Sequence, residues 1–442
     1  MAQRKKPTAL TLRAYQVGFG DCFLLTFHYD SADRHVLIDF GSTGQPRNSG
    51  PKLMARVAQD IRKVCTPADG GTPKLHAVVA THRHRDHISG FDDTGGPDSP
   101  GAIIAGLAPD LVVQPWTEHP KANPETGAVT RGTTAKGLHA QSLAFVSALQ
   151  DMHAISQAVL VEADRRKSAI GKTTLKEITF LGEDNLKNLA AVKNLMRMGK
   201  GRRGKYVHFG SDSGLEKILP GVKVRVLGPP NLKQSDEITK QRARDADEFW
   251  HFHAVAGRLT TKKTPKVFRR AATYSATQTP PYTRWFIKRM RSVRGEQMLS
   301  IMRTLDSVMN NTSLILLFEV GGKKLLFPGD AQIENWSYAL SKPSVRRLLE
   351  DVNLYKVGHH GSLNATPKTL WGLFKNRSEK KKTGRLLTVC STMPGKHGKT
   401  TSKTEVPRRT LVEALKSLSD YHTTEDIKLK ESLCDTITIP FS

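Results

Sequence analysis

One stretch decides the fold of this chain: Leu75-His76-Ala77-Val78-Val79-Ala80-Thr81-His82-Arg83-His84-Arg85-Asp86-His87. Its first half is an apolar run that predicts a buried strand, and its second half packs four metal-ligand side chains into six positions. In open α/β sheets, the side chains that carry chemistry lie in loops at the carboxyl ends of strands. The stretch therefore predicts a strand that delivers a metal-binding loop to one edge of a sheet.

The spacing within this loop predicts a pair of metal sites. In extended backbone, His82 and His84 project to the same side and can chelate one ion, while Arg83 points away. Where the chain then turns, Asp86 and His87 swing toward a second ion. Imidazole and carboxylate ligands together favour zinc, with manganese or iron as alternatives. We therefore expect two divalent cations, zinc first and manganese second; a solvated histidine-rich loop is the alternative.

The run from His82 to His87 resembles the HxHxDH signature of the metallo-β-lactamase superfamily. Further segments resemble the family and follow in its order: Gln16-Val17-Gly18-Phe19-Gly20-Asp21-Cys22-Phe23-Leu24-Leu25, Val36-Leu37-Ile38-Asp39-Phe40-Gly41, Asn310-Asn311-Thr312-Ser313-Leu314, Leu325-Leu326-Phe327-Pro328-Gly329-Asp330-Ala331 and Lys356-Val357-Gly358-His359-His360-Gly361-Ser362. These details are similar to the branch that contains the soluble domain of ComEC-type competence proteins and the phosphorylcholine esterases. The resemblance implies an α/β fold, the four-layer αββα metallo-β-lactamase fold, with a large basic insertion of helices and loops.

The resemblance also implies roles for residues outside the loop. Asp39 stands where the family has an aspartate that supports the metal loop, and Asp330 where it has a carboxylate that bridges both metals. A plain turn that ends a strand is the alternative for Asp330. One of His359 and His360 ligates the second metal, and the other contacts substrate or donates a proton. The predicted metal ligands are His82, His84, Asp86, His87, Asp330, His359 and His360, and the predicted catalytic residues are Asp86, His360 and His397.

No middle histidine of the chain lies in a recognisable motif for the third ligand of the first metal. The ComEC-like branch has an Asn and Ser segment before the bridging aspartate, so we expect Asn311 or Ser313 near this ion, directly or through water. His251 and His253 have ligand-like spacing, but an amphipathic helix of the insertion is the favoured interpretation for them.

Several further residues are predicted to contact substrate beside the metals. Ser362 lies in a tight turn whose backbone amides can face an anion. Trp116 ends a predicted strand at residues 110–116, and Glu118 and His119 follow it. All three can line the pocket, and a structural role is an equal alternative for Trp116. His397 can bind a phosphate oxygen in the loop after the strand at 386–391, where Lys396 adds charge. An exposed basic loop without a catalytic part is the favoured interpretation of that last segment.

Net charge is the second strong signal of the sequence. The 442 residues include 68 Lys and Arg against 41 Asp and Glu, which gives a formal net charge of +27. Positive residues gather in runs at 200–205, 262–270, 284–294 and 375–385. A solvated surface explains any single run, but the sum favours a polyanion such as nucleic acid as the partner.

The chain is expected to form two halves of one fold. We predict a first half over residues 1–230 with a helical insert, a basic helical insertion over 231–308, and a second half over 309–442. The insertion can clamp nucleic acid or bind a protein partner. The four cysteines lack paired spacing, and we find neither a signal-peptide pattern nor an apolar run of membrane-spanning length. These features predict a bacterial, cytoplasmic protein without a membrane partner.

Together these features predict a metal-dependent hydrolase. The first hypothesis is a phosphodiesterase or nuclease that cleaves DNA or RNA through a metal-activated hydroxide at a binuclear site. Because a fold does not determine its substrate, a small-molecule hydrolase of a lactone, thioester or phosphorylcholine ester is the second. The third is a basic nucleic-acid-binding subunit of a bacterial defence or DNA-uptake system with a vestigial metal site. Strong salt dependence of binding separates the first hypothesis from the second.

Overall fold

The chain divides into two compact units. The computed structural model describes residues 6–119, 156–184, 188–231, 233–235, 295–303, 306, 308–362, 366–393, 395–396 and 405–441. Unit 1 comprises residues 1–146, 187–239 and 309–442, and unit 2 comprises residues 147–186 and 240–308. Every strand named below belongs to unit 1.

The first sheet of unit 1 has seven strands in the described part of the chain, in the order β13-β1-β2-β3-β4-β5-β6. Its strands are β1 (Ala9–Tyr15), β2 (Cys22–His28), β3 (Arg34–Phe40), β4 (Ala77–Val79), β5 (Leu111–Pro115), β6 (Gly204–Val207) and β13 (Cys434–Pro440). Strands β3 to β6 pair in parallel, whereas β13, β1, β2 and β3 pair antiparallel. The apolar run that precedes the HxHxDH segment therefore lies in the middle of a mixed sheet.

The second sheet has six strands among the described residues, in the order β12-β11-β10-β9-β8-β7. Its strands are β7 (Lys223–Gly228), β8 (Ile315–Val320), β9 (Lys323–Phe327), β10 (Leu354–Lys356), β11 (Leu387–Cys390) and β12 (Asp420–Thr423). Strands β8 and β9 form a hairpin, and its two glycines, Gly321 and Gly322, have the positive φ of 50° and 71° that a tight hairpin turn requires. The α/β class predicted from the sequence is confirmed.

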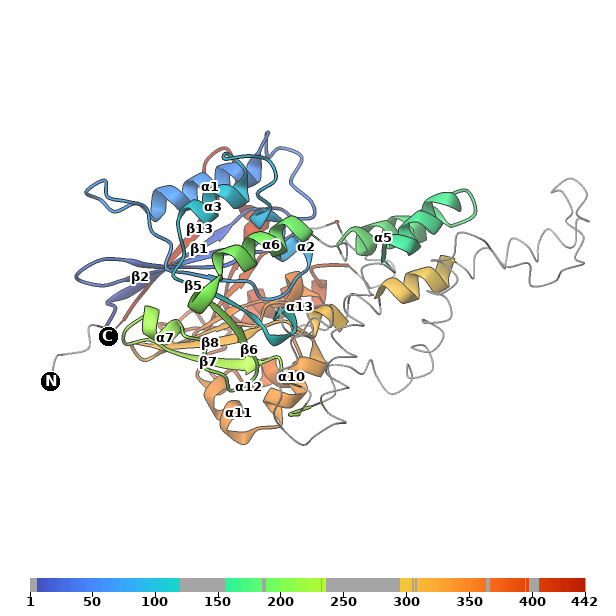
Figure 1. Cartoon of the computed structure of the whole chain (residues 1–442). Helices are drawn as coiled ribbons and strands as arrows, with labels where there is room; N and C mark the ends of the chain where they lie inside the picture. The colour runs from blue at the N-terminus through green and yellow to red at the C-terminus, as the bar shows by residue number, and fades with distance from the viewer. Residues whose placement is uncertain are drawn as a thin grey trace, which may run out of the picture. The chain divides into compact units, whose positions relative to one another are not determined.

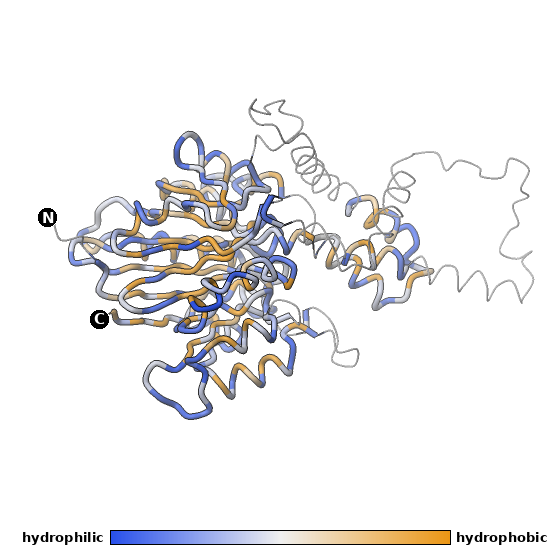
Figure 2. The backbone as a smooth tube through the Cα atoms, turned by 90° about the horizontal axis from the view of Figure 1, so that it is seen from below, coloured by the Kyte–Doolittle hydropathy of each residue, from blue (hydrophilic) through white to orange (hydrophobic). Residues whose placement is uncertain are grey.

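A shared apolar core lies between residues of both sheets. Phe23 of β2, Phe318 of β8 and Phe327 of β9 belong to one buried cluster, and the ring of Phe327 meets the other two edge-on at 6.2 and 5.9 Å. Burying each such side chain contributes about 1.5–3 kcal/mol. Figure 2 shows hydrophobic residues along the strands and hydrophilic residues in many of the loops that join them. Because successive side chains of a strand alternate between faces, each sheet offers a second apolar face.

Helices cover that second face of each sheet (Figure 1). Three pack on the first sheet: α1 (Leu53–Val64), α3 (Pro100–Gly106) and α6 (Leu189–Met198). Four pack on the second: α10 (Ile333–Leu340), α11 (Pro343–Glu350), α12 (Lys368–Leu373) and α13 (Arg409–Leu418). The short helices α2 (Arg85–Ile88) and α7 (Leu215–Ile218) follow β4 and β6. Of the described helices, none has both the length and the hydropathy needed to span a bilayer.

Unit 2 is helical where it is described. It contains α5 (Lys172–Asp184) and helical segments at residues 156–165 and 295–303. Arg303 donates to the Glu177 carboxylate at 3.0 Å, which joins two of these helical segments. The first of these helical segments is described from residue 156, and residues 120–155 lie outside the described residues. So do His251, His253 and the basic runs at 262–270 and 284–294.

Two strands at the end of the chain were not predicted from the sequence. Strand β12 follows α13 and pairs in parallel with β11, and β13 pairs antiparallel with β1, with Leu10 opposite Ile439. The signal was present, because Ile437 and Ile439 alternate with Thr436 and Thr438 at the period of a strand. These strands complete one side of each sheet.

The carboxyl ends of the parallel strands create the edge where the site forms. The HxHxDH segment follows β4, Asp330 follows β9, and His359 and His360 follow β10. Strand β8 runs antiparallel to β9, so the residues just before β8 reach the same edge. Segments that are far apart in the sequence are therefore brought together there.

Candidate metal centre

Asp39, at the end of β3, holds the loop that follows β4. Its carboxylate accepts hydrogen bonds from the backbone N–H and the side-chain hydroxyl of Thr81, both at 2.7 Å. Asp39 is fully buried and has a φ of 56°, in the left-handed region that non-glycine residues rarely adopt. Such strain persists only where the surrounding structure fixes it. The loop therefore begins from a rigid anchor.

Close packing of a neighbouring loop fixes the backbone of Asp86 and His87. A Cβ atom added to Gly41 would lie 2.4 Å from the Asp86 carbonyl carbon and from the His87 nitrogen, so only glycine fits. The backbone N–H of Asp21 donates to the Asp86 carbonyl at 2.9 Å. These contacts hold the one-turn helix α2 and the two side chains that it carries.

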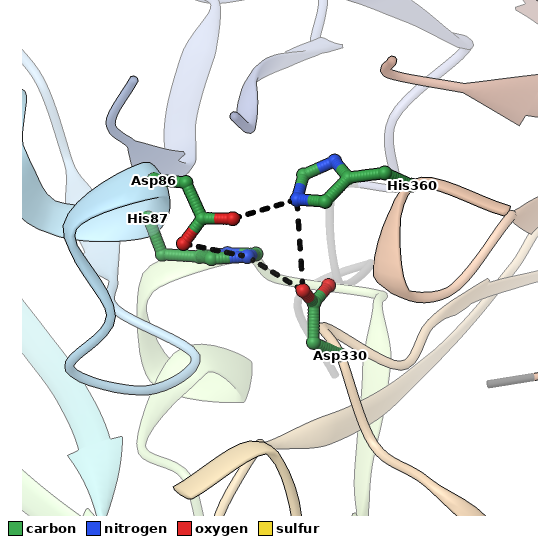
Figure 3. A group of neighbouring side chains, drawn as sticks. All are labelled: Asp86, His87, Asp330 and His360. Carbon is green, nitrogen blue, oxygen red and sulfur yellow. Dashed lines mark hydrogen bonds and ion pairs between the residues drawn. The ribbon is translucent and has the colours of Figure 1, made fainter. Parts of the chain in front are cut away.

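Four buried side chains converge at the sheet edge, as Figure 3 shows. Asp86 and His87 come from α2, Asp330 from the turn after β9, and His360 from the segment after β10. Each offers one ligand atom, and these atoms all lie within 4.8 Å of one another. Nε2 of His360 is 2.8 Å from Asp86 Oδ2, and Nε2 of His87 is 3.0 Å from Asp330 Oδ2. We call these residues the four-residue group.

A second cluster adjoins the first. His82, His84 and Asp86 also bring ligand atoms within 4.8 Å of one another, and we call them the three-residue group. Nε2 of His82 lies 3.0 Å from Nδ1 of His84, and the His82 and His87 rings are 4.2 Å apart between centroids. Asp86 belongs to both groups, so one carboxylate links them.

Buried atoms without hydrogen bonds indicate that the four-residue group fits a cation. Among the described residues, Asp86 Oδ1, His87 Nε2 and Asp330 Oδ2 are buried and accept or donate no hydrogen bond. Leaving such an atom unsatisfied costs about 1–3 kcal/mol. Imidazole nitrogens with carboxylate oxygens are the donor set used for zinc, and they also suit manganese and iron. These buried His and Asp side chains could therefore hold a metal ion.

Hydrogen bonds on the outer ring nitrogens aim two imidazoles into the four-residue group. Nδ1–H of His87 donates to Asp39 at 2.8 Å, and Nδ1–H of His360 donates to the backbone carbonyl of Ser391 at 2.9 Å. In the neutral form of each ring these bonds place the proton on Nδ1, so the Nε2 lone pair faces the group and is available to a cation. This arrangement is typical of metal-ligating histidines.

The electrostatics of the cluster favour positive charge at its centre. Burial lowers the pKa of His87, but the Asp330 and Asp86 carboxylates outweigh burial and raise this pKa well above its ordinary value. His360 follows the same pattern, and Asp330 and Asp21 raise its pKa to about 9 despite burial. Burial, with His87 and His84, lowers the pKa of His82 well below its ordinary value. A metal ion would supply the positive charge that protons otherwise bring to His87 and His360.

Two site residues, Asp21 and Lys356, were not predicted from the sequence. Both are buried, and they form an ion pair with each other. Nζ of Lys356 also donates to the Gly329 carbonyl at 3.1 Å and lies 3.4 Å from Asp330 Oδ1. Burial lowers the pKa of Lys356, but Asp21 and Asp330 outweigh burial and raise it, so the ammonium stays charged. The available signal was a lysine that ends an apolar strand.

The structure separates the two histidines that the sequence could not distinguish. The His360 side chain is fully buried in the four-residue group, whereas that of His359 is 21% exposed and its Nε2 lies 4.0 Å from Asp330 Oδ2. Both residues have positive φ, 41° and 51°, so the backbone is strained on each side of their shared peptide. Ser362 Oγ lies 3.0 Å from Nδ1 of His359 and orients that ring. His359 thus occupies the solvent side of the centre.

The segment before β8 lies beside the three-residue group. Oδ1 of Asn310 is 3.1 Å from Nδ1 of His84. Asn311 instead donates to Glu334 of α10 at 3.0 Å, and Ser313 Oγ accepts the Asp330 backbone N–H at 3.3 Å. We expected Asn311 or Ser313 near the first metal, and the structure brings their neighbour Asn310 to His84.

The segment after β5 is tied to the metal loop through Arg83. This guanidinium forms an ion pair at 2.8 Å with Glu118, which lies between Trp116 and His119. The Trp116 indole donates to the carbonyl of residue 230 at 3.1 Å, and the His119 ring lies edge-on to Tyr206 at 4.7 Å. Trp116 and His119 therefore flank Glu118, the residue that pairs with the metal loop. Neither belongs to a group of potential metal ligands.

Lys396 packs over the loop that follows β3. A Cβ atom added to Gly44 would lie 2.7 Å from Cε of Lys396, so the lysine stem covers this glycine. His397, predicted as a catalytic residue, lies outside the described residues. Of the two residues predicted in this loop, the structure therefore places only Lys396.

The two described basic runs lie away from the metal centre. Residues 200–203 precede β6 and residues 375–385 precede β11, so both lead into the amino ends of strands whose carboxyl ends face the site. In the second run, Arg385 is buried and binds the Ser378 and Ser417 carbonyls and the Asp420 carboxylate. That residue therefore stabilises the fold.

No protein-family model matches the chain, and no curated protein matches it. The buried His and Asp clusters and the charge of the chain are therefore the observations from which a function can be argued. Of the two, the clusters are the more specific, because they combine ligand chemistry with converging geometry.

Proposed function

We propose that this protein is a metallo-hydrolase with a metallo-β-lactamase fold, and that it acts as a phosphodiesterase or nuclease on DNA or RNA. Two facing sheets with helices on their outer faces support the fold assignment. So does the order in which the chain supplies the centre: the segment after β4, then the turn after β9, then the segment after β10.

One observation carries the proposal. Asp86, His87, Asp330 and His360 come from three separate segments, are each at most 2% exposed, and direct ligand atoms at one another. Burying several ionisable groups without a partner cation costs several kcal/mol per charge, so a fold retains such a cluster when it binds something there. Asp86 extends the cluster to His82 and His84, which favours two ions over one.

The residues of the centre have different chemical roles. When bound, two divalent cations would supply Lewis acidity that lowers the pKa of a water toward neutrality and stabilises charge on the departing oxygen. Asp86 and Asp330 bring the negative charge that retains the cations. The partly exposed His359 lies on the solvent side and contacts the substrate, and Ser362 keeps its ring in place.

A phosphate polymer is the substrate class that the charge of the chain favours. A net charge of +27 attracts polyanions over distances comparable to the Debye length, about 8 Å at physiological salt. The described basic runs lead into the amino ends of β6 and β11, so we assign them attraction of the polymer to the protein surface and not contact with the scissile bond. Binding to nucleic acid should therefore weaken steeply as salt rises.

The test is cleavage of labelled DNA and RNA by the purified protein with added Mg²⁺, Mn²⁺ or Zn²⁺. We expect cleavage in at least one condition, its loss on chelation, and a fall of at least about 10³-fold for Asp330→Ala. Asp351→Ala is the matched control, because the Asp351 side chain is 65% exposed and pairs only weakly with Lys324, at 3.6 Å. That variant should cut at the wild-type rate.

Three outcomes would contradict the proposal. A metal-loaded protein that leaves every nucleic acid intact while hydrolysing a lactone or a phosphorylcholine ester would assign the site to small molecules. Equal cleavage by wild type and Asp330→Ala would trace the activity to a contaminant. Salt-insensitive binding of nucleic acid would remove the electrostatic part of the argument.

A further inference from the structure

A buried lysine lies directly behind the four-residue group. Lys356 is the last residue of β10 and is 2% exposed. Its stem passes the ring of Phe23, with Nζ 5.9 Å from the ring centroid, and its ammonium ends between Asp21 and Asp330. Taking a charged side chain out of water is costly, so its retention at this position calls for a specific role.

The contacts of Lys356 make the two oxygens of Asp330 different. Oδ1 accepts the backbone N–H of His359 at 3.0 Å and lies 3.4 Å from Nζ of Lys356. Oδ2 forms no hydrogen bond within the described part of the chain and faces Nε2 of His87 at 3.0 Å and of His360 at 3.6 Å. The carboxylate is thereby held by one oxygen and presents the other.

The same ammonium also fixes the turn that carries Asp330. It donates to the carbonyl of Gly329. Glycine is required at this position because φ is 54° and because a Cβ atom there would lie 2.8 Å from Cβ of Thr81. Thr81 in turn is bonded to Asp39. Lys356 therefore links the β9 turn, the β10 strand and, through Asp21, the segment before β2.

We propose that Lys356 is a positioning residue of the metal centre: it orients Asp330 so that Oδ2 alone faces the cations. This inference rests on the proposed metal site but not on the proposed substrate. It also predicts a change in cation affinity, on replacement of Lys356, that is opposite in sign to the change expected from charge alone. Removing a nearby positive charge should tighten cation binding by Coulomb attraction, whereas loss of positioning should weaken it.

The experiment measures metal affinity of the full chain by competition with a chromophoric chelator, using Zn²⁺ and Mn²⁺ as probes. Lys356→Met keeps the stem and removes the ammonium, and we expect its affinity to fall by about 10- to 100-fold, the range for partners that orient metal ligands. Asp21→Asn with Lys356→Met removes both charges and should remain weak, because Oδ1 of Asp330 still lacks its lysine. Lys324→Met, on the neighbouring strand β9, is the control and should bind as wild type does.

The outcomes separate the inference from its alternatives. Tighter metal binding by Lys356→Met would overturn the positioning role in favour of a pure charge effect. Unchanged binding would show that Lys356 has no effect on the metal. If Lys356→Met does not fold, as judged by circular dichroism, the charge-balanced double variant decides, and wild-type affinity in that variant would overturn the inference. A wild-type protein that retains metal but cuts no nucleic acid would refute the proposed substrate and leave this inference intact.

Discussion

The four-residue and three-residue groups share Asp86, yet the protein supports them unequally. The four-residue group has two carboxylates, and its members are braced by Asp39, the Ser391 carbonyl and Lys356. The three-residue group has one carboxylate, that of the shared Asp86. Its outer contacts are neutral: the Thr81 hydroxyl lies 3.2 Å from Nδ1 of His82, and the Asn310 amide lies beside His84.

Converging ligands therefore do not make equal sites. Carboxylate charge and outer hydrogen bonds both raise metal affinity, and the four-residue group has more of each. We therefore expect a tight ion at the four-residue group and a weaker one at the three-residue group.

Asp86→Ala should have the largest effect, because Asp86 is the residue that the two groups share. We expect both ions to be lost and cleavage to fall by at least about 10³-fold. Elemental analysis after desalting measures the metal content, and Asp351→Ala serves as the control. A variant that still retains two equivalents of metal would show that Asp86 is not a ligand shared by the two ions.

His84→Ala should remove one ion and spare the other. His84 belongs to the three-residue group alone, so we expect metal content to fall from about two equivalents to about one, with the tight affinity unchanged. Titration calorimetry follows both steps. The control is His422→Ala, a half-buried histidine of the edge strand β12 that pairs with Asp435 at 2.6 Å and belongs to neither group. Loss of the tight ion in His84→Ala would contradict the proposed division.

Asp39→Asn should weaken the four-residue group without removing a ligand. The amide can donate to Nδ1 of His87, which would move the ring proton to Nε2 and block its lone pair. We expect a fall of about 10- to 100-fold in the affinity for the tight ion and little change in the weaker one. Equal weakening of both ions would point to a general disturbance of the loop held through Thr81.

The sequence predicts well those features of the two groups that depend on neighbouring residues. An apolar run followed by His82, His84, Asp86 and His87 is a local pattern, and so is the strand that ends before Asp330. The mixed α/β class follows from such runs, since their periods and turn residues are local too. The approximate positions of both groups could therefore be predicted before any coordinates.

Apart from Asp39, the residues that brace the site were not predicted, because their roles arise from packing. Lys356 resembles any lysine at a strand end until β10 places it behind Asp330. Ser391 acts through its backbone carbonyl, which has no signature in the sequence. Asn310 and Asn311 are adjacent and chemically identical, and only the start of β8 determines which one meets His84.

This adjacency offers a matched test of the weaker ion. Asn310→Ala should lower the affinity of the three-residue group by about tenfold, whereas Asn310→Asp should raise it because a carboxylate replaces a neutral amide. Asn311→Ala loses its contact with Glu334 and should leave both affinities unchanged. If the two alanine variants behave alike, the proximity of Asn310 to His84 has no bearing on the metal.

The smallest effect concerns stability at acid pH, which must be separated from loss of metal. Burial, with the neighbouring His76, lowers the pKa of His35 to about 4, and burial with Arg34 does the same for His76. An unfolded histidine titrates near 6.5. Between about pH 6.5 and 4 the unfolded chain takes up protons that the folded chain refuses, so the free energy of unfolding should fall as pH falls, and be fully retained above pH 6.5.

We expect His35 to account for about 1 kcal/mol of that loss between pH 7.5 and 5.5. His35→Gln keeps a group that can bond Thr26 but does not titrate, so its unfolding free energy should depend less on pH than that of wild type. Urea titrations with chelator present measure the difference without a metal contribution. Identical pH slopes would place the acid sensitivity elsewhere. A shallower slope would allow metal release from the two groups to be measured at pH 5.5 on a protein that is still folded, where competition from protons should remove the weaker ion first.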